Sequence, residues 1–269
     1  MTGASPLAGR IAVVIGGGGS IGGACAHALA GAGARVAIVD RDASAANAVA
    51  TPLEAFAHAA DCGDEASLFA ARDAIERALG PADILIHSSA VFQSLIPAAA
   101  LPMRKWDEVV RVDQRGVFLA CRIFGETMIA QGGGAIVNVA SVAGMRSFPL
   151  HAYAAAKAAV IAMSSNLAAE WGASGVRVNA LSPGFTRTAA VQAAIDGGSR
   201  HDRPMVEGTP LGRLVEPEEV AQAALFLASP AASAITGINL PVDCGWLVGA
   251  PWQAYGGLGA LQTQNGAGS

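Results

Sequence analysis

The sequence of 269 residues has little charge and no long apolar run, and both features narrow the class of protein. Charged residues make up 14% and hydrophobic residues 52%, which implies extensive burial and excludes disorder for the body of the chain. The net charge is −4 and the arginines are scattered, so we expect no nucleic-acid partner. No stretch approaches a membrane span, and the N-terminus has no basic segment followed by an apolar one. These features predict a soluble, cytoplasmic protein without a membrane partner.

Cysteine and histidine are also sparse. The four cysteines stand far apart with no C-x-x-C pair, which favours unpaired thiols in a reducing compartment over a disulfide framework. The five histidines form no H-x-x-x-H or H-x-x-E-H group. We therefore expect no metal site.

Short runs rich in valine and isoleucine alternate with longer helical patterns. Strands are expected at 11–15, 36–39, 84–86, 136–139, 176–181 and about 240–242, and helices at 21–32, 65–79, 106–130, 153–171 and 217–228. Continuous apolar strands between helices predict a parallel sheet covered on both faces, a single-domain Rossmann-like doubly wound α/β fold. The domain is assigned to residues 1–250, and a partly mobile C-terminal tail to 251–269.

A glycine-rich turn follows the first predicted strand directly. Gly17, Gly19 and Gly22 satisfy G-x-G-x-x-G, and the next helix begins near Ile21. A strand, a glycine turn and a helix N-terminus together present backbone N–H groups to a pyrophosphate. The alternative is a flexible turn that binds nothing, and the position after the first strand disfavours it.

Asp40 closes the second predicted strand, 18 residues beyond Gly22. A carboxylate there accepts hydroxyls of an adenosine ribose and repels a 2′-phosphate, which favours NAD over NADP. The neighbouring Arg41 keeps NADP open, because a guanidinium could turn toward a phosphate. A strand-ending aspartate is also a common turn residue.

The chain has two lysines and two tyrosines, and one of each, Tyr153 and Lys157, stands four positions apart in a predicted helix. Residues at this spacing share one helix face, so the ammonium would favour the ionised phenol. A base active near neutral pH needs about 3–4 kcal/mol of help, because a phenol titrates near 10. A positive charge about 5 Å away supplies roughly 3 kcal/mol. The alternative is a pair of unrelated surface residues.

Taken in chain order, the glycine turn, Asp40, Ser141, Tyr153 and Lys157 resemble the short-chain dehydrogenase/reductase family over about residues 7–249. Further similar stretches are Asp61-Cys62, 136–144, 176–184, 210–213 and 216–220. Enoyl reductases of the same broad group space Tyr and Lys more widely, and halohydrin dehalogenases carry Arg in place of Lys. Both are disfavoured.

The resemblance implies a role for each matching residue. Tyr153 would be the general acid/base, Ser141 would hold the substrate oxygen, and Lys157 would bind the nicotinamide ribose. Asp113 stands where relatives have the asparagine of a proton relay, and we expect the relay to survive at a helix kink. The residues that would contact the cofactor are Gly16, Gly19, Ser20, Ile21, Gly22, Asp40, Asp61, Cys62, Ser88, Ser89, Ala90, Tyr153, Lys157, Pro183, Gly184, Thr186 and Thr188.

Three other positions depart from the family pattern. Ile15 replaces the usual Thr, and Ser20 replaces the middle Gly of the turn, although its hydroxyl could donate to phosphate. The fourth strand ends in His87-Ser88-Ser89-Ala90 in place of Asn-Asn-Ala-Gly. We interpret His87 as a packed strand-end residue and not as a catalyst.

The expected substrate pocket is lined by 91–95, 145–151 and 185–214, with Trp246, Trp252 or Tyr255 as further candidates. These walls are largely apolar and suit a hydrophobic or aromatic secondary alcohol. Arg146, His151 and Gln93 are candidate polar contacts or ordinary solvated loop residues. Segment 189–208 is expected to form a lid over the substrate.

These features predict an NAD-dependent oxidoreductase that exchanges a hydride with a secondary alcohol or ketone, with oxidation as the physiological direction. The alternatives are an NADP-dependent carbonyl reductase, a non-catalytic dinucleotide-sensing protein, and an epimerase or dehydratase of the longer, extended relatives. Helices 106–130 and 153–171 suggest a homotetramer or homodimer, since alanines permit close helix approach and relatives commonly form tetramers.

Overall fold

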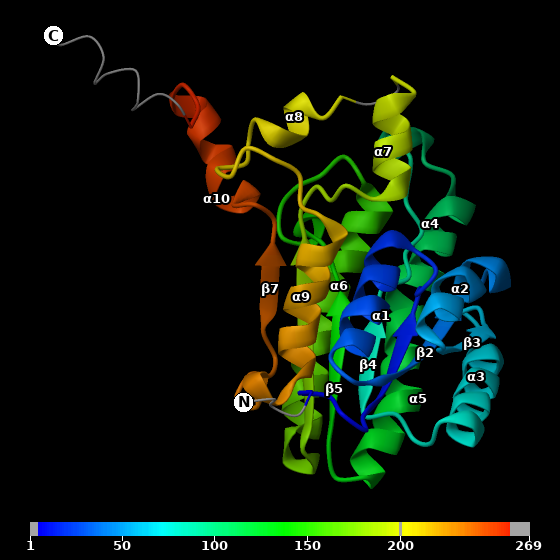
Figure 1. The fold of residues 1–269 in the computed structure, drawn as a ribbon. Coiled ribbons are helices and arrows are strands. Elements are labelled where there is room, and N and C mark those ends of the chain that lie inside the picture. Colours follow the sequence, from blue (N-terminus) through cyan, green and yellow to red (C-terminus); the bar gives the residue numbers. More distant parts are fainter. Residues whose placement is uncertain (1–4, 199–200, 259–269) are drawn as a thin grey trace, which may run out of the picture.

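A computed structural model describes residues 5–198 and 201–258. Within these residues, seven strands form one parallel sheet in the order β3-β2-β1-β4-β5-β6-β7 (Figure 1). The strands are β1 (Ile11–Ile15), β2 (Arg35–Asp40), β3 (Phe56–Ala59), β4 (Ile84–His87), β5 (Gly134–Val139), β6 (Val176–Pro183) and β7 (Asn239–Val242). The strand order reverses beside β1, which pairs with both β2 and β4, and ligands bind at such reversals. The predicted doubly wound fold is confirmed.

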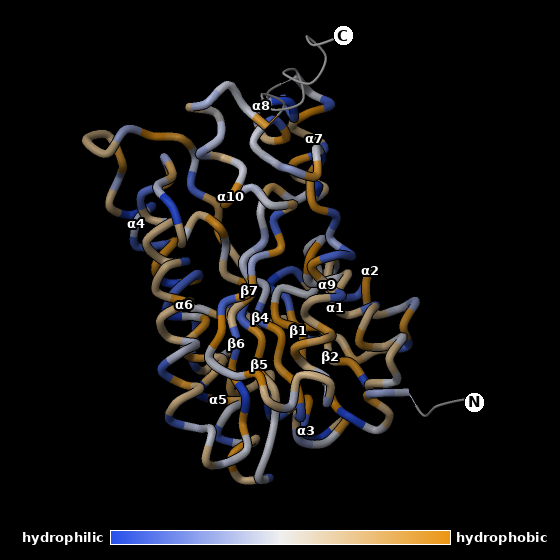
Figure 2. Tube along the Cα trace, turned by 90° about the vertical axis from the view of Figure 1, so that its left-hand side faces the viewer, coloured by the Kyte–Doolittle hydropathy of each residue, from blue (hydrophilic) through white to orange (hydrophobic). Residues whose placement is uncertain are grey.

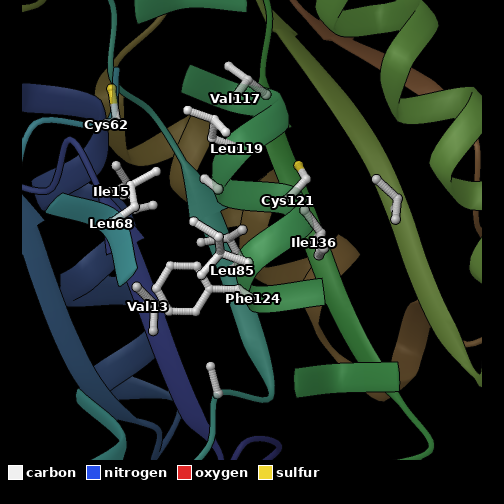
Figure 3. Packing of buried hydrophobic residues seen from close by; sticks show 14 of the residues in the cluster. Val13, Ile15, Cys62, Leu68, Leu85, Val117, Leu119, Cys121, Phe124 and Ile136 are labelled. Carbon is white, nitrogen blue, oxygen red and sulfur yellow. The ribbon is translucent and has the colours of Figure 1, made fainter. Parts of the chain in front are cut away.

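Helices cover both faces of the sheet, as Figure 2 shows in a view turned from that of Figure 1. One layer contains α1 (Ser20–Gly31), α2 (Ala43–Ala50) and α9 (Pro217–Ala228). The other contains α3 (Glu65–Ala78), α5 (Val117–Ala130) and α6 (His151–Trp171). Figure 3 shows the second layer, where Phe124 of α5 packs toward Leu85 and Val13 of the sheet.

Local sequence explains where several elements begin. β1 and β4 are wholly buried, as their continuous apolar runs predict. α9 begins at Pro217, and Glu216 and Glu219 form a reciprocal capping box, so the predicted bounds of this helix are correct. α3 begins after Asp64, whose carboxylate accepts from the Ala66 and Ser67 amides.

The predicted helix 106–130 is three consecutive helical pieces. α4 (Met103–Val109) leads into a π-helical turn, Val110–Gly116, and then into α5. Asp113 lies in the middle of this turn, so the helix distortion expected at this residue is present. π-helical turns occur frequently at functional sites.

Some elements were not predicted. β3 is only half-buried and contains His58, so its four residues lack a clear apolar pattern. The short helices α2, α7 (Ala189–Asp196), α8 (Arg203–Val206) and α10 (Trp246–Gly249) were also missed. The last three lie beyond the carboxyl ends of the strands, at the top of Figure 1. Of the predicted tail, Ala250–Tyr255 forms a 3-10 helix, and 259–269 lie outside the described residues.

Among the described residues, every helix is too short or too polar to span a membrane. The same part of the chain contains no group of three or more His, Cys, Asp or Glu side chains arranged to hold a metal ion.

Candidate functional site

The glycine-rich stretch that leads from β1 into α1 is packed too tightly for side chains at Gly16, Gly17, Gly18 and Gly22. Gly16 has a positive φ of 75°, and an added Cβ would meet the backbone of Ser89. A Cβ at Gly22 would collide with the Gly16 carbonyl oxygen. Gly19 precedes α1 and provides no side-chain cap, so the first amides of this helix are available to a ligand. The turn therefore fits a pyrophosphate group.

Asp40 is fixed at the end of β2, beside this turn. Its Oδ2 accepts from the Gly18 amide at 3.0 Å and its Oδ1 from the Asp42 amide at 3.1 Å. Gly18 belongs to the glycine turn, so the carboxylate is oriented by the same backbone that would hold the pyrophosphate. Arg41, the residue that could bind the 2′-phosphate of NADP, is exposed.

Asp61 and Cys62 follow β3 at the same edge of the sheet. Asp61 accepts from the Gly63 amide at 2.8 Å and pairs with Arg111 at 2.8 Å. Partial burial opposes ionisation of Asp61, but these two partners hold its pKa below the ordinary value. Burial raises the pKa of the Cys62 thiol to about 11. Arg111 was not predicted to belong to the site. It lies in the π-helical turn, 50 residues after Asp61 in the sequence.

Tyr153 and Lys157 lie on the same face of α6, and both are buried, at 6% and 2% exposure. The Lys157 ammonium lies 5.5 Å from the centre of the Tyr153 ring and donates to the Val139 carbonyl at 3.0 Å. The surface-pair alternative is wrong, because neither side chain is at the surface.

Ser141 follows β5, as predicted, and its hydroxyl also interacts with Tyr153. Its Oγ accepts from the Ala143 amide at 3.1 Å, so it caps the short turn Val142–Gly144. The Ser141 hydroxyl therefore both caps this turn and contacts the phenol. Ser141, Tyr153 and Lys157 gather at the carboxyl edge of the sheet.

The pKa of Tyr153 departs from the sequence prediction. Burial raises the pKa of the phenol above its ordinary value near 10, the Asp113 carboxylate raises it further, and the hydrogen bond with Ser141 lowers it. The sequence predicted that Lys157 lowers the pKa of Tyr153. Desolvation of the phenolate outweighs that effect, because the Lys157 ammonium is directed to the Val139 carbonyl. Without a cofactor, Tyr153 is therefore held as the neutral phenol.

Asp113 is fully buried, and its carboxylate touches two parts of the site. Oδ1 accepts from the Val91 amide at 2.7 Å, and Oδ2 lies 4.0 Å from the Lys157 ammonium. Burial raises the pKa of Asp113, while Lys157 and the Val91 amide lower it. Burial lowers the pKa of Lys157, and Asp113 opposes that effect. The two side chains form a buried, coupled pair.

The stretch after β4 also lies at this edge. The Ser88 amide donates to Ile15 at 2.8 Å, and the Ser89 backbone lies against Gly16, while Ala90 is exposed. His87 is buried at 1% exposure, and neither ring nitrogen has a hydrogen-bond partner among the described residues. Burial and the Lys157 charge lower the pKa of His87 to about 3. The prediction of a packed strand-end histidine agrees with this environment.

The segment after β6 brings the remaining predicted cofactor residues to the crevice. Pro183 is buried, and a Cβ at Gly184 would meet Asp243, so this backbone approaches β7 closely. Thr186 donates to the Gly184 carbonyl at 3.1 Å. Thr188 caps α7 by accepting from the Val191 amide. Neither threonine hydroxyl is oriented by chance, because each has a backbone partner.

Of the three predicted polar substrate contacts, Gln93 has a structural partner. It is 5% exposed, and its Oε1 accepts from the Ala152 amide at 2.7 Å in the first turn of α6, one residue before Tyr153. Arg146 and His151 are exposed. Gln93 therefore orients α6, the helix that carries Tyr153 and Lys157. This contact was not predicted from the sequence.

Aromatic side chains gather near Tyr153. Phe148, Phe185 and Trp246 form a cluster with ring centres 5.2–6.2 Å apart. Phe148 packs against the buried group that includes Tyr153. Phe92 stacks on the Tyr153 ring at 5.2 Å and is 67% exposed. Phe92, Phe148 and Phe185 come from the predicted pocket walls 91–95, 145–151 and 185–214, and Trp246 was a further candidate.

Comparison with known proteins identifies the family. A family model described as enoyl-(acyl carrier protein) reductase matches residues 16–247. The chain belongs to the short-chain dehydrogenase/reductase family. The description names enoyl reductases, for which the wider spacing of Tyr and Lys was noted above. In this chain, Tyr153 and Lys157 stand four positions apart.

Two curated relatives and one solved structure illustrate the similarity. D-threitol dehydrogenase of Mycolicibacterium smegmatis is 43% identical over 90% of this chain and 94% of its own. Cis-4-hydroxycyclohexanecarboxylate dehydrogenase of Sinomonas cyclohexanicum is 39% identical over 88% and 96%. The 3-ketoacyl-(acyl-carrier-protein) reductase from Brucella melitensis complexed with NADH is 34% identical, covers 90% of this chain and 100% of its own, and has a TM-score of 0.85. The family and these relatives support an NAD(P)-dependent oxidoreductase acting on CH–OH groups.

Proposed function

We propose that this protein is an NAD-dependent dehydrogenase of a hydrophobic secondary alcohol, with Tyr153 as general acid/base. The observation that carries the proposal is the buried group of Ser141, Tyr153 and Lys157 at the carboxyl edge of the sheet. The glycine turn lies at the same edge, where β1 meets β4. A protein that only sensed a dinucleotide would have no use for this group.

Each side chain of this group has a separate role in the reaction. NAD, when bound, supplies the hydride acceptor. Ser141 holds the alcohol oxygen, and Tyr153 takes the proton of the hydroxyl as negative charge develops on that oxygen. Lys157 stabilises the phenolate and binds the ribose, and Asp113 keeps Lys157 charged in its buried position. Because Tyr153 is buried, the proton that it takes from the substrate leaves toward solvent through the Lys157 and Asp113 relay.

The orientation of Asp40 supports NAD as the cofactor. Both carboxylate oxygens accept backbone amides, which fixes the negative charge at the end of β2. A 2′-phosphate within about 4 Å of it would meet a repulsion of about 4 kcal/mol at an effective dielectric near 20. The alternative, an NADP-dependent carbonyl reductase, requires Arg41 to turn from solvent toward the crevice.

The aromatic cluster supports a substrate with an apolar ring or chain. Phe148, Phe185 and Trp246 present faces and edges that bury hydrocarbon, whereas a polyol would need several hydrogen-bonding side chains. Arg146 and His151 stay available as polar contacts at the rim. An acyclic polyol, the substrate class in the name of one relative, is the competing candidate.

A substrate panel tests the function and the cofactor together. Cyclic secondary alcohols and acyclic polyols are offered with NAD or NADP, and the reduced cofactor is followed by absorbance. We expect turnover with NAD and a cyclic alcohol, and a Tyr153→Phe variant that binds NAD without turnover. Preference for NADP would contradict the Asp40 assignment, preference for a polyol would contradict the aromatic pocket, and full activity of Tyr153→Phe would contradict the mechanism.

We also propose a cytoplasmic homotetramer or homodimer. The four cysteines are all free and buried, in keeping with a reducing compartment. Phe118, on α5, is 43% exposed, and several residues of α6 are exposed, so these two helices offer the contact surface. Light scattering of the purified protein tests the assembly, and a monomer would contradict it.

A further inference from the structure

Ser20 joins two segments that lie far apart in the sequence. Its Oγ accepts a hydrogen bond of 3.0 Å from the Ala189 amide, a separation of 169 residues. Ser20 is the first residue of α1, and Ala189 is the first residue of α7. The glycine turn and the segment after β6 are therefore tied together at the mouth of the crevice. A glycine at position 20 has no side chain and could not make this bond.

The Ser20 hydroxyl retains unused hydrogen-bonding capacity. A hydroxyl has one proton to donate and two lone pairs to accept with. The Ala189 amide uses one lone pair, and the proton has no acceptor among the described residues. Gly19 supplies no side chain at this helix end, so the Ser20 hydroxyl is the one polar side-chain group between Gly16 and Gly23. It stands where the glycine turn fits a pyrophosphate.

Helix α7 depends on a few anchors. No residue of this helix is buried, so it gains little from hydrophobic packing. The Thr188 side chain accepts from Val191, and Arg187 at the base of the helix bonds both Glu216 and Gln192. The Ser20 bond is an anchor to the cofactor crevice itself, and the preceding segment supplies Phe185 to the aromatic cluster.

We infer that Ser20 is a positioning residue that couples dinucleotide binding to the ordering of α7. It donates its proton to a pyrophosphate oxygen while it accepts from Ala189. Donation to an anion polarises the hydroxyl and makes its oxygen a better acceptor, so each bond strengthens the other. Because coupling is reciprocal, an anchored α7 also tightens dinucleotide binding. The inference rests on the proposed dinucleotide site and assigns this residue a second partner in it.

The test compares three variants with the wild-type protein. Ser20→Ala removes the hydroxyl, Ser20→Thr restores it, and Ser165→Ala removes an exposed hydroxyl elsewhere, on α6. Two quantities are measured, the NAD dissociation constant by calorimetry and hydrogen exchange of the 189–196 amides with and without ligand. Circular dichroism confirms that each variant is folded.

In the wild-type protein and in Ser165→Ala, NAD should slow exchange across 189–196. In Ser20→Ala, NAD should bind about tenfold more weakly, the loss expected for one hydrogen bond to a charged group, and protection of 189–196 should disappear. Ser20→Thr should recover both. ADP-ribose, which keeps the pyrophosphate, should protect 189–196 as NAD does, whereas adenosine should not.

Two results separate this inference from the proposed function. If the wild-type protein does not bind NAD, both fail. If it binds NAD and Ser20→Ala keeps the same affinity or the same protection, the coupling through Ser20 is wrong and the dehydrogenase proposal stands. Equal protection by adenosine would also overturn it, since the pyrophosphate would not be the trigger.

Discussion

Replacing Asp113 by asparagine removes one charge from the buried pair and leaves its shape unchanged. The amide oxygen of asparagine still accepts from Val91, which Asp113 Oδ1 does at 2.7 Å. The atom that changes is Oδ2, which lies 4.0 Å from the Lys157 ammonium. The variant therefore tests whether Asp113 keeps Lys157 charged.

The separation sets the size of the effect. Two unit charges 4.0 Å apart attract by about 4 kcal/mol at an effective dielectric near 20. Burial lowers the pKa of Lys157 and Asp113 opposes that effect, so removal of the carboxylate lowers the Lys157 pKa further. Asp113 also raises the pKa of Tyr153, so the phenol should ionise more easily in the variant. Both pKa values move down.

The two lysines of the chain make the measurement direct. Protein labelled with ¹³C at lysine Cε gives one signal from Lys157 and one from Lys105, which pairs with Glu108 on α4. We expect the Lys157 signal of Asp113→Asn to titrate at lower pH than in the wild-type protein. The pH profile of kcat/KM should lose activity on its alkaline side.

An unchanged Lys157 titration would show that the pair is not coupled as its geometry implies. A gain in activity of about tenfold would contradict the expectation that the relay operates with aspartate at this position, since it would mean that the carboxylate impedes catalysis.

Three further predictions follow from the surroundings of single residues. His87→Asn should flatten the loss of stability in acid. The pKa of His87 is about 3 in the folded protein and 6.5 in the unfolded chain, so its contribution to stability is complete above pH 6.5 and falls as the pH drops toward 3. The loss amounts to at most about 5 kcal/mol. Denaturant unfolding at several pH values checks this, with exposed His27→Asn as the control, and an equal loss of stability in acid for His87→Asn and wild type would refute it. Gly22→Ala should push the Gly16 carbonyl out of place at a cost of about 1–3 kcal/mol and weaken NAD binding, whereas Gly31→Ala, in the same helix with open space at Cβ, should not. Calorimetry that finds equal NAD affinities would show that the turn does not hold the cofactor. Gln93→Ala should leave the Ala152 amide without its acceptor, at a cost of about 1 kcal/mol in stability. The melting temperature and kcat should therefore both fall. A variant with unchanged kcat would limit Gln93 to a packing role.

Much of the fold follows from local patterns. The bounds of β1 and α9 match the prediction, because one is a continuous apolar run and the other begins with proline and two acidic residues. β3 was missed because Phe56–Ala59 gains its strand conformation from pairing with β2 and not from its own pattern. The Tyr153 and Lys157 pairing was predicted correctly, since helix periodicity alone places both on one face.

The electrostatics of the site could not be read from spacing. The pKa of Tyr153 depends on its burial and on Asp113, which is 40 positions away in sequence and reaches the site only through the fold. The role of Gln93 at the start of α6 and the bond between Ser20 and Ala189 are likewise long-range contacts. Local sequence carries no signal for such contacts, whereas it does carry one for helix faces and strand ends.

Titration of Tyr153 with and without NAD is the sharpest test of its assignment as the catalytic acid/base. The chain has two tyrosines, so protein labelled with ¹³C at tyrosine Cζ gives one signal from buried Tyr153 and a reference signal from Tyr255, which is 83% exposed. Without NAD, Tyr153 should titrate above the ordinary value near 10, because burial and Asp113 oppose its ionisation. With NAD bound, the positive nicotinamide ring and a Lys157 turned toward the ribose should lower the Tyr153 pKa by at least about one unit. An unchanged or higher pKa in the complex would contradict the assignment of Tyr153 as the catalytic acid/base.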